Sequence, residues 1–222
     1  MRENQQVSIP VIKRLPRYHR YLEELKNNGV VRISSRELSS RMGLTASQIR
    51  QDLNCFGGFG QQGYGYNIEQ LYNEIGNILG INKRSKAIMI GAGNLGHDIA
   101  THLHFENRGF DLIGIFDNNK SVIGTNVGGR TEMASDELED FCNREHPVAA
   151  ILCIPSEYAA ENADKLVSLG IKGFWNFTQY DLVNKYEGVA VENVHLGDSL
   201  MTLCYQINSK PETNETNKDE KK

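Results

Sequence analysis

The sequence predicts an α/β protein in which an N-terminal winged helix-turn-helix precedes a C-terminal Rossmann dinucleotide-binding domain. Three observations lead to this fold class: a glycine-rich turn between an apolar strand and a helix at residues 86–96, alternating strand and helix patterns after it, and a capped helix pair followed by clustered glycines before it. Strands that alternate with helices are typical of a mainly parallel sheet. The 222 residues suffice for two domains, and we expect the boundary near Asn82.

The composition is that of an ordinary globular protein, with 39% hydrophobic residues. No apolar run approaches the roughly 18 residues of a membrane span, and residues 1–6 lack the apolar core of a signal peptide. The cysteines have no C-x-x-C spacing, and the histidines have no metal-ligand spacing. We therefore expect a cytoplasmic protein with no membrane segment, metal site or disulfide framework, in which the cysteines are buried thiols: Cys55, Cys142, Cys153 and Cys204.

Charge is distributed unevenly along the chain, whose formal net charge is −4. Residues 1–85 contain 12 Lys+Arg against 7 Asp+Glu, a net +5, whereas residues 86–222 contain 12 against 21, a net −9. A basic first third on an acidic protein indicates that this part alone has a polyanionic partner. The last stretch, residues 209–222, lacks apolar side chains and is predicted to be a disordered tail.

The first helix is predicted to run from about Ser8 to Asn27. Pro10 lies in its first turn and Gly29 lies just past its end, which are common positions for these residue types. Pro16 lies inside the pattern, so we expect either a kink there or a later start. The helix carries a basic cluster that is either a solvated face or a surface contacting phosphates: Lys13, Arg14, Arg17 and Arg20.

Two further helices form the pattern of a helix-turn-helix. The first spans residues 34–43 and ends at Gly43. Thr45 and Gln48 are expected to form a capping box for the second, which runs from Ala46 to about Phe56. A short helix, a glycine turn and a second helix with a polar face are typical of DNA-binding modules.

The second helix of this pair has the residue types that read base edges. Ile49 and Leu53 fall on one apolar face at i and i+4. The polar residues fall on other faces: Ser47, Arg50, Gln51 and Asn54. Arginine suits guanine, and glutamine suits adenine. Helix pairs of this kind also occur in proteins that do not bind DNA, so the pattern alone leaves the function open.

A glycine-rich segment follows, with five glycines in residues 57–65. Phe59, Tyr64 and Tyr66 alternate with these glycines, which favours a small β-hairpin whose tip approaches another backbone closely. After a helix-turn-helix, such a hairpin is a wing. The alternative is a flexible linker. A helix at 69–79 then leads to the domain boundary.

The second domain begins with the most specific motif of the chain. An apolar strand is followed by Gly91, which permits a tight turn, Gly93, which allows close approach of a pyrophosphate, and Gly96, which lets the helix pack near the strand. The pyrophosphate would lie at the helix N-terminus. Asp117, which is 21 positions past the last glycine, is predicted to bind the adenosine ribose and to favour NAD(H) over NADP(H). Alternatively, Asp117 is only a turn residue at the end of its strand.

The rest of the chain completes the sheet. About 90 ordered residues follow Asp117, which leaves no room for a separate substrate domain. An NAD-dependent oxidoreductase with an accessory N-terminal domain is the alternative, and a nucleotide-binding scaffold without DNA affinity does not explain the basic first third. The expected elements are helices at 135–145, 156–169 (capped by Ser156) and 198–207, and strands at 148–154, 173–177 and 189–194.

At several motifs the chain resembles the Rex redox-sensing transcriptional repressors. These are Thr45–Tyr66, the glycine turn at 91–96 and Gly170–Phe177, within a resemblance that covers residues 9–207. The resemblance implies a repressor, not an enzyme, that binds palindromic double-stranded operator DNA as a homodimer and is released when NADH binds. It implies domains at 1–82 and 83–195, with a last helix at 196–208 that is exchanged between subunits.

The resemblance also assigns site residues, without a metal. The DNA contacts would be Arg14, Thr45, Ser47, Gln48, Arg50, Gln51 and, in the wing, Gln61, Gln62 and Gly63. The sites for NADH and NAD+ would be Gly91, Ala92, Gly93, Asn94, Leu95, Gly96, Asp117 and, near the nicotinamide, Ile154, Pro155, Asn176 and Phe177.

Some positions depart from the pattern of the family. Many members have a basic residue at the positions of Gln51, Gln61 and Gln62, so the operator sequence cannot be transferred. Many have Asp where this chain has His195, and that Asp pairs with an arginine at the position of Arg20. Because a neutral histidine cannot form the same ion pair, this part of the mechanism is not carried over.

Overall fold

The computed structural model describes residues 7–57, 60–61 and 64–209. The chain divides into two compact units, with the division between Arg84 and Ser85, two residues beyond the expected boundary. The short segment Asn107–Gly109 groups with the first unit. Within the described residues, no helix is both long enough and apolar enough to cross a membrane.

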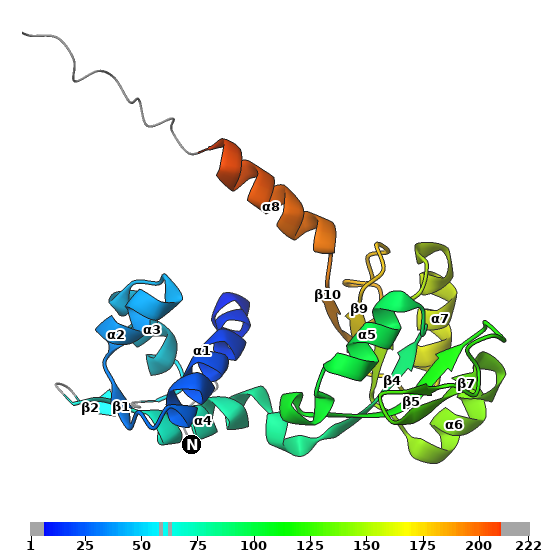
Figure 1. The fold of residues 1–222 in the computed structure, drawn as a ribbon, viewed down its shortest axis with the longest axis horizontal. Helices are drawn as coiled ribbons and strands as arrows, with labels where there is room; N and C mark the ends of the chain where they lie inside the picture. Colours follow the sequence, from blue (N-terminus) through cyan, green and yellow to red (C-terminus); the bar gives the residue numbers. More distant parts are fainter. Residues whose placement is uncertain (1–6, 58–59, 62–63, 210–222) are drawn as a thin grey trace, which may run out of the picture. The chain divides into compact units, whose positions relative to one another are not determined.

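The described residues of the first unit form four α-helices, a 3-10 turn and a small antiparallel sheet (Figure 1). The strand order is β1-β3-β2, in which the β2–β3 hairpin is the predicted wing. The elements are α1 (Ile9–Asn27), β1 (Arg32–Ile33), α2 (Ser35–Met42), α3 (Ala46–Asn54), β2 (Gly60–Gln61), β3 (Gly65–Asn67), α4 (Ile68–Leu79) and the 3-10 turn η1 (Ile81–Lys83).

Helix α1 runs without interruption through Pro16, which is exposed. The alternative of a later start is therefore wrong, because the helix already begins at Ile9 with Pro10 in its first turn. Gly29 has a φ of 73° just past the end of the helix, a conformation that glycine adopts without strain. The core of the unit draws apolar side chains from all four α-helices, including Leu15, Tyr18, Leu22, Leu38, Met42, Ile49, Leu53, Leu71 and Ile75.

The caps of α2 and α3 explain where these helices begin. Ser34 and Glu37 form a complete capping box, with backbone–side chain distances of 3.1 and 2.8 Å. The box expected at α3 is only half formed. The Thr45 hydroxyl accepts from the Gln48 backbone N–H at 3.1 Å, but the Gln48 side chain donates to Asp52 instead.

The second unit is a seven-stranded sheet with order β10-β9-β8-β4-β5-β7-β6. All neighbouring strands are parallel except the β6–β7 hairpin, so the expected mainly parallel sheet is confirmed. The strands are β4 (Ser85–Ile90), β5 (Phe110–Asp117), β6 (Asn126–Val127), β7 (Arg130–Ala134), β8 (Ala149–Leu152), β9 (Gly173–Asn176) and β10 (Ala190–Asn193). The helical elements are α5 (Asn94–His102), η2 (Phe105–Arg108), η3 (Ser135–Glu137), α6 (Leu138–Glu145), α7 (Ser156–Ser168) and α8 (Leu196–Asn208).

Alternate residues of the central strand β4 serve two apolar layers. Ile88 and Ile90 pack with side chains of α6 and α7 on one face of the sheet. Ala87 and Met89 pack with Ala100 of α5 on the other face, and Figure 1 shows these helices on opposite sides of the sheet. Both faces of β4 are therefore buried, as expected for a central parallel strand.

Two local predictions are wrong. Ser156 does not cap α7 but is its first helical residue, after Pro155, and its hydroxyl accepts from the Gln179 backbone N–H at 3.1 Å. The cysteines are also not uniformly buried, because Cys55 and Cys204 are exposed.

Helix α8 has an apolar surface that the described residues of this chain do not cover. None of its residues is buried, although six large apolar side chains lie on it. These side chains are between 49% and 72% exposed: Leu196, Leu200, Met201, Leu203, Tyr205 and Ile207. A contiguous exposed apolar surface of this kind marks an interaction site.

Candidate dinucleotide and nucleic-acid sites

Each glycine of the turn after β4 has the environment that its predicted role requires. Gly91 has a φ of 94°, and a Cβ there would collide with the Cys153 carbonyl and approach Ile154 Cγ2 at 2.8 Å. A Cβ on Gly96 would collide with the Gly91 carbonyl, so α5 packs directly against the turn. A Cβ on Gly93 would meet nothing within 4 Å. The open backbone at Gly93 suits the approach of a ligand.

The first turn of α5 suits an anion. Gly93 is the N-cap and supplies no side-chain cap, and the first turn contains no acidic residue. Asn94 and Leu95 are exposed there, whereas Ala92 and Gly96 are buried. Backbone N–H groups and the helix dipole at such a terminus favour a phosphate group.

Hydrogen bonds just past the strand ends align the loops that were predicted to hold the cofactor. The loops after β4 and β8 lie next to each other where the strand order reverses, which is where doubly wound sheets bind ligands. The turn at Gly91 therefore lies beside Ile154. The aligning bonds are Gly91 N to Phe116 O (2.8 Å), Cys153 N to Ile90 O (2.9 Å) and Phe177 N to Leu152 O (3.0 Å).

Asp117 is hydrogen-bonded to the glycine turn. Its Oδ2 accepts from the Ala92 backbone N–H at 2.7 Å, and its Oδ1 accepts from the Asn119 backbone N–H at 2.8 Å. The bond from Asn119 forms the strand-end turn that was the alternative role for Asp117. The bond from Ala92 places the carboxylate beside the glycine turn. Each carboxylate oxygen has a second lone pair with which it can accept from ribose hydroxyls.

Two other titratable groups near the turn have pKa values above their ordinary ones. Burial raises the pKa of the Cys153 thiol to about 12. Burial and, to a smaller extent, the charge of Asp117 raise the pKa of Glu132, which is 2% exposed and whose Oε2 lies 3.2 Å from the Thr125 hydroxyl. Asp117 is the carboxylate that is hydrogen-bonded to the glycine turn.

The residues predicted near the nicotinamide differ in their surroundings. Pro155 is exposed, while Ile154 and Phe177 are half-buried, and the Phe177 ring packs edge-on against Trp175 with centroids 4.5 Å apart. Asn176 is fully buried. Its amide donates to Tyr180 O (2.8 Å) and Asn193 Oδ1 (2.9 Å), and its oxygen accepts from the Thr178 backbone N–H and hydroxyl (3.1 and 2.8 Å). These bonds fix the loop after β9 to β10.

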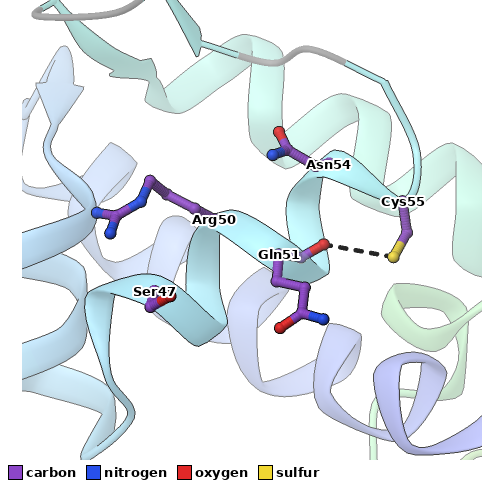
Figure 2. A pocket seen from close by; sticks show the side chains of 5 residues that line it. All are labelled: Ser47, Arg50, Gln51, Asn54 and Cys55. Atoms are coloured by element: carbon purple, nitrogen blue, oxygen red, sulfur yellow. Dashed lines mark hydrogen bonds between the residues drawn. The ribbon is translucent and has the colours of Figure 1, made fainter.

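The exposed face of α3 forms an open polar recess (Figure 2). It brings together Ser47, Arg50 and Gln51, three of the predicted DNA contacts, with Asn54 and Cys55. The sequence already placed Asn54 away from the apolar face of this helix, two helical turns after Ser47 and therefore on the same side, whereas Cys55 was not selected. Arg50 donates to the Ser35 hydroxyl at 3.0 Å, and the Cys55 thiol donates to Gln51 O at 3.3 Å.

The other predicted DNA contacts differ in their exposure and in their hydrogen-bond partners. Arg14 and Gln48 donate to the buried carboxylate of Asp52, and Thr45 is exposed at the cap of α3. In the wing, the Tyr64 carbonyl accepts from Arg32 at 3.2 Å. Gln62 and Gly63 lie outside the described residues, as does the side chain of Gln61.

Two features remain: the surroundings of His195 and Arg20, where many family members form an ion pair, and the question of a metal site. His195 Nδ1 lies 3.5 Å from Asp198 Oδ2, and His195 Nε2 is a buried atom without a hydrogen-bond partner. The Arg20 guanidinium lies 5.8 Å from the centroid of the Tyr21 ring. In the described part of the chain, no group of three or more His, Cys, Asp or Glu side chains is placed to bind a metal ion.

A winged helix with a polar recognition surface and a Rossmann unit with a dinucleotide turn define a class: DNA-binding regulators controlled by a nucleotide. Comparisons with known proteins agree with this class. Residues 6–54 match the family described as "Putative DNA-binding protein N-terminus", and residues 82–180 match the family described as "CoA binding domain". The chain belongs to the Rex family of redox-sensing transcriptional repressors.

Family membership rests on relatives that match nearly the whole chain. The redox-sensing transcriptional repressor Rex of Thermoanaerobacter pseudethanolicus is 55% identical over 94% of this chain and 92% of its own length. That of Clostridium botulinum is 50% identical over 93% of this chain and 98% of its own. A crystal structure of RSP with β-NAD+ and operator DNA superposes with a TM-score of 0.85 at 56% identity, covering 92% of this chain and 94% of RSP. RSP with β-NADH gives 0.83 at 53% identity, over 92% and 96%.

Proposed function

We propose that this protein is a transcriptional repressor that binds a palindromic operator as a homodimer and leaves it when NADH binds. The observation that carries the proposal is the presence in one chain of the α3 recess and of the glycine turn with Asp117. A relative with the same fold has been solved with operator DNA and β-NAD+, and also with β-NADH. Binding of the two ligands to separate units provides two sites, which is what allosteric control requires.

DNA recognition is assigned to the polar face of α3. Arg50 is exposed there and suits a bidentate contact with guanine, while Gln51 suits adenine. Ser47 and Thr45 are exposed near the helix N-terminus, where hydroxyl groups contact phosphates or bases. The wing residues Gln61, Gln62 and Gly63 stay in the proposal as minor-groove contacts.

The cofactor is assigned to the turn after β4. The pyrophosphate would lie on the turn residues and on the first amides of α5, and the adenosine ribose would lie on Asp117. NADH and NAD+ differ only at the nicotinamide, so residues around that ring must distinguish them. The loops after β8 and β9 carry Ile154, Pro155 and Phe177, and Asn176 holds the second loop in place.

The homodimer is proposed from α8. Six large apolar side chains on one exposed helix are unfavourable in water, and a second copy of the same helix region would cover them. A two-fold dimer also matches a palindromic operator, because each recognition helix reads one half-site. Replacing Leu200 and Leu203 by Asp should convert a particle of twice the chain mass of 25.0 kDa into a monomer, as measured by light scattering. A dimer that survives both substitutions would place the interface elsewhere.

We propose further that the protein is a cytoplasmic regulator and not an enzyme. Rex proteins are regulators by the name of their family. The strands and helices after Asp117 complete the sheet, which leaves no second domain for a substrate in the described residues. Incubation with NAD+ and a panel of small alcohols and hydroxy acids should produce no NADH absorbance.

The test of the proposed function uses a duplex that the protein itself selects from a random-sequence library. We expect the selected sequence to be palindromic, and we expect NADH to displace the labelled duplex in fluorescence anisotropy at concentrations where NADPH does not. An Asp117→Ala variant is the matched control and should need much more NADH. Failure to select any duplex, or a duplex insensitive to NADH, would contradict the proposal.

A further inference from the structure

A buried carboxylate joins the recognition helix α3 to the first helix α1. Asp52 of α3 has no exposed surface and accepts four hydrogen bonds. Arg14 of α1 donates two of them, from Nε to Oδ2 and from Nη2 to Oδ1, both at 2.7 Å. Tyr18 of α1 donates to Oδ2 at 2.9 Å, and Gln48 of α3 donates to Oδ1 at 2.9 Å. Three of these bonds cross between the two helices.

Asp52 and Arg14 are the charged members of this network under physiological conditions. Burial alone would raise the pKa of Asp52, but the hydrogen bonds from Arg14, Gln48 and Tyr18 outweigh it and hold this pKa below its ordinary value. The hydrogen bond to Asp52 raises the pKa of Arg14. Arg14 and Asp52 therefore form a permanent bidentate ion pair, which adds directional restraint to the contact.

The rest of the contact between α3 and the core lacks this directionality. Ile49 and Leu53 are buried and apolar, and burial of apolar surface has no angular preference. The exposed residues Arg50 and Gln51 flank the buried Asp52 in sequence. A rotation of α3 about its axis would move both of them relative to a DNA groove, and the planar pair with Arg14 opposes that rotation.

We infer that Asp52 is a positioning residue, which fixes the rotation of α3 against α1 so that Arg50 and Gln51 reach base edges. The inference rests on the proposed operator binding. Arg14 and Gln48 then act on recognition through Asp52, not as contacts to DNA. Because Asp52 neutralises the charge of Arg14, this arginine does not add to the phosphate contacts that make binding depend on salt.

The double variant Arg14→Met, Asp52→Asn separates positioning from phosphate contact, because it keeps the net charge of the wild type. Its affinity for the selected operator and for an unrelated duplex of equal length is measured by fluorescence anisotropy across a salt series. We expect operator affinity to fall by roughly tenfold or more, because a small displacement of base-reading groups forfeits whole contacts worth that much. We expect unchanged affinity for the unrelated duplex and an unchanged salt slope on it.

Two further variants complete the design. Arg17→Met is the matched control, since it makes the same substitution at an exposed arginine one turn further along α1, and it should leave the preference for operator unchanged. Tyr18→Phe keeps the aromatic ring in the core and removes one of the four bonds, so it decides the question if the double variant does not fold. It should lower operator affinity severalfold with the same salt slope.

The inference is overturned if the double variant keeps the wild-type preference for operator over unrelated DNA. It is also overturned if the salt slope falls by about 0.9, the value for one lost phosphate contact on duplex DNA. In the first case Arg14 and Asp52 would be only a structural pair. In the second case Arg14 would contact a phosphate directly. If the wild type itself selects no duplex, the proposed function fails, and this result is distinct from the other two.

Discussion

Asp117 should set both the strength and the selectivity of cofactor binding. In the structure it accepts the Ala92 and Asn119 N–H groups at 2.7 and 2.8 Å, and we propose that its remaining lone pairs accept from the ribose hydroxyls. A hydrogen bond to a charged group is worth about 1.5–3 kcal/mol, so loss of one or two ribose bonds in Asp117→Ala should weaken NADH binding roughly 10²-fold. A 2′-phosphate about 4 Å from a carboxylate is repelled by about 4 kcal/mol per unit charge near a protein surface. Removing Asp117 should therefore reduce the preference for NADH over NADPH by at least about tenfold.

Calorimetric titration with NADH and NADPH measures both effects. Asp117→Ala also leaves the buried Ala92 N–H without its acceptor, which costs about 1–3 kcal/mol of stability and should lower the thermal midpoint. Asp117→Asn separates the two roles, because its amide oxygen can still accept from Ala92 but carries no charge. We expect this variant to recover much of the stability and little of the selectivity. Wild-type selectivity in both variants would refute the reasoning and place the discrimination elsewhere.

Three further results are expected. Arg50→Ala should lower the preference for operator by about 1–3 kcal/mol, while NADH affinity is unchanged. A wild-type footprint from this variant would remove Arg50 from base recognition. Operator DNA should slow alkylation of the exposed Cys55, which lines the α3 recess, and NADH should restore the alkylation rate. Cys153 should react slowly throughout, because burial raises its pKa to about 12. Equal rates for Cys55 with and without operator would contradict the assigned DNA-binding face. Burial lowers the pKa of His19 below its ordinary 6.5, so the unfolded chain binds the proton first as pH falls, and stability is lost below about pH 6.5. The thermal midpoint of His19→Phe should therefore fall less than that of the wild type between pH 7.5 and 5.5. An equal fall would exclude His19 as a source of acid sensitivity.

Local chemistry in the sequence was sufficient to predict the elements around both sites. The turn at Gly91 and the cap at Thr45 depend on residue types that few alternatives replace, so their spacing located β4, α5 and α3 closely. The β6–β7 hairpin was missed, although Gly128 and Gly129 between two short segments are a hairpin signal.

The Asp52 network could not be predicted in the same way. An acidic residue on a helix with a polar face is ordinarily solvent-exposed, and nothing nearby in the sequence shows that this one is buried. Its partners Arg14 and Tyr18 lie 38 and 34 positions earlier in the chain. Their contact depends on how α1 packs against α3, which is tertiary information. The same holds for Asn176, whose side chain is committed to Tyr180 and Asn193.

Thermodynamic reciprocity is the most direct test of whether operator binding and NADH binding are coupled in this protein. A ligand shifts an equilibrium only by its preference for one state, and a shift from 1:99 to 99:1 needs about 5.5 kcal/mol. The NADH dissociation constant should therefore be measured by calorimetry with and without saturating operator. Operator should weaken NADH binding by the same factor by which NADH weakens operator binding. Equal NADH affinity in the two titrations would contradict it.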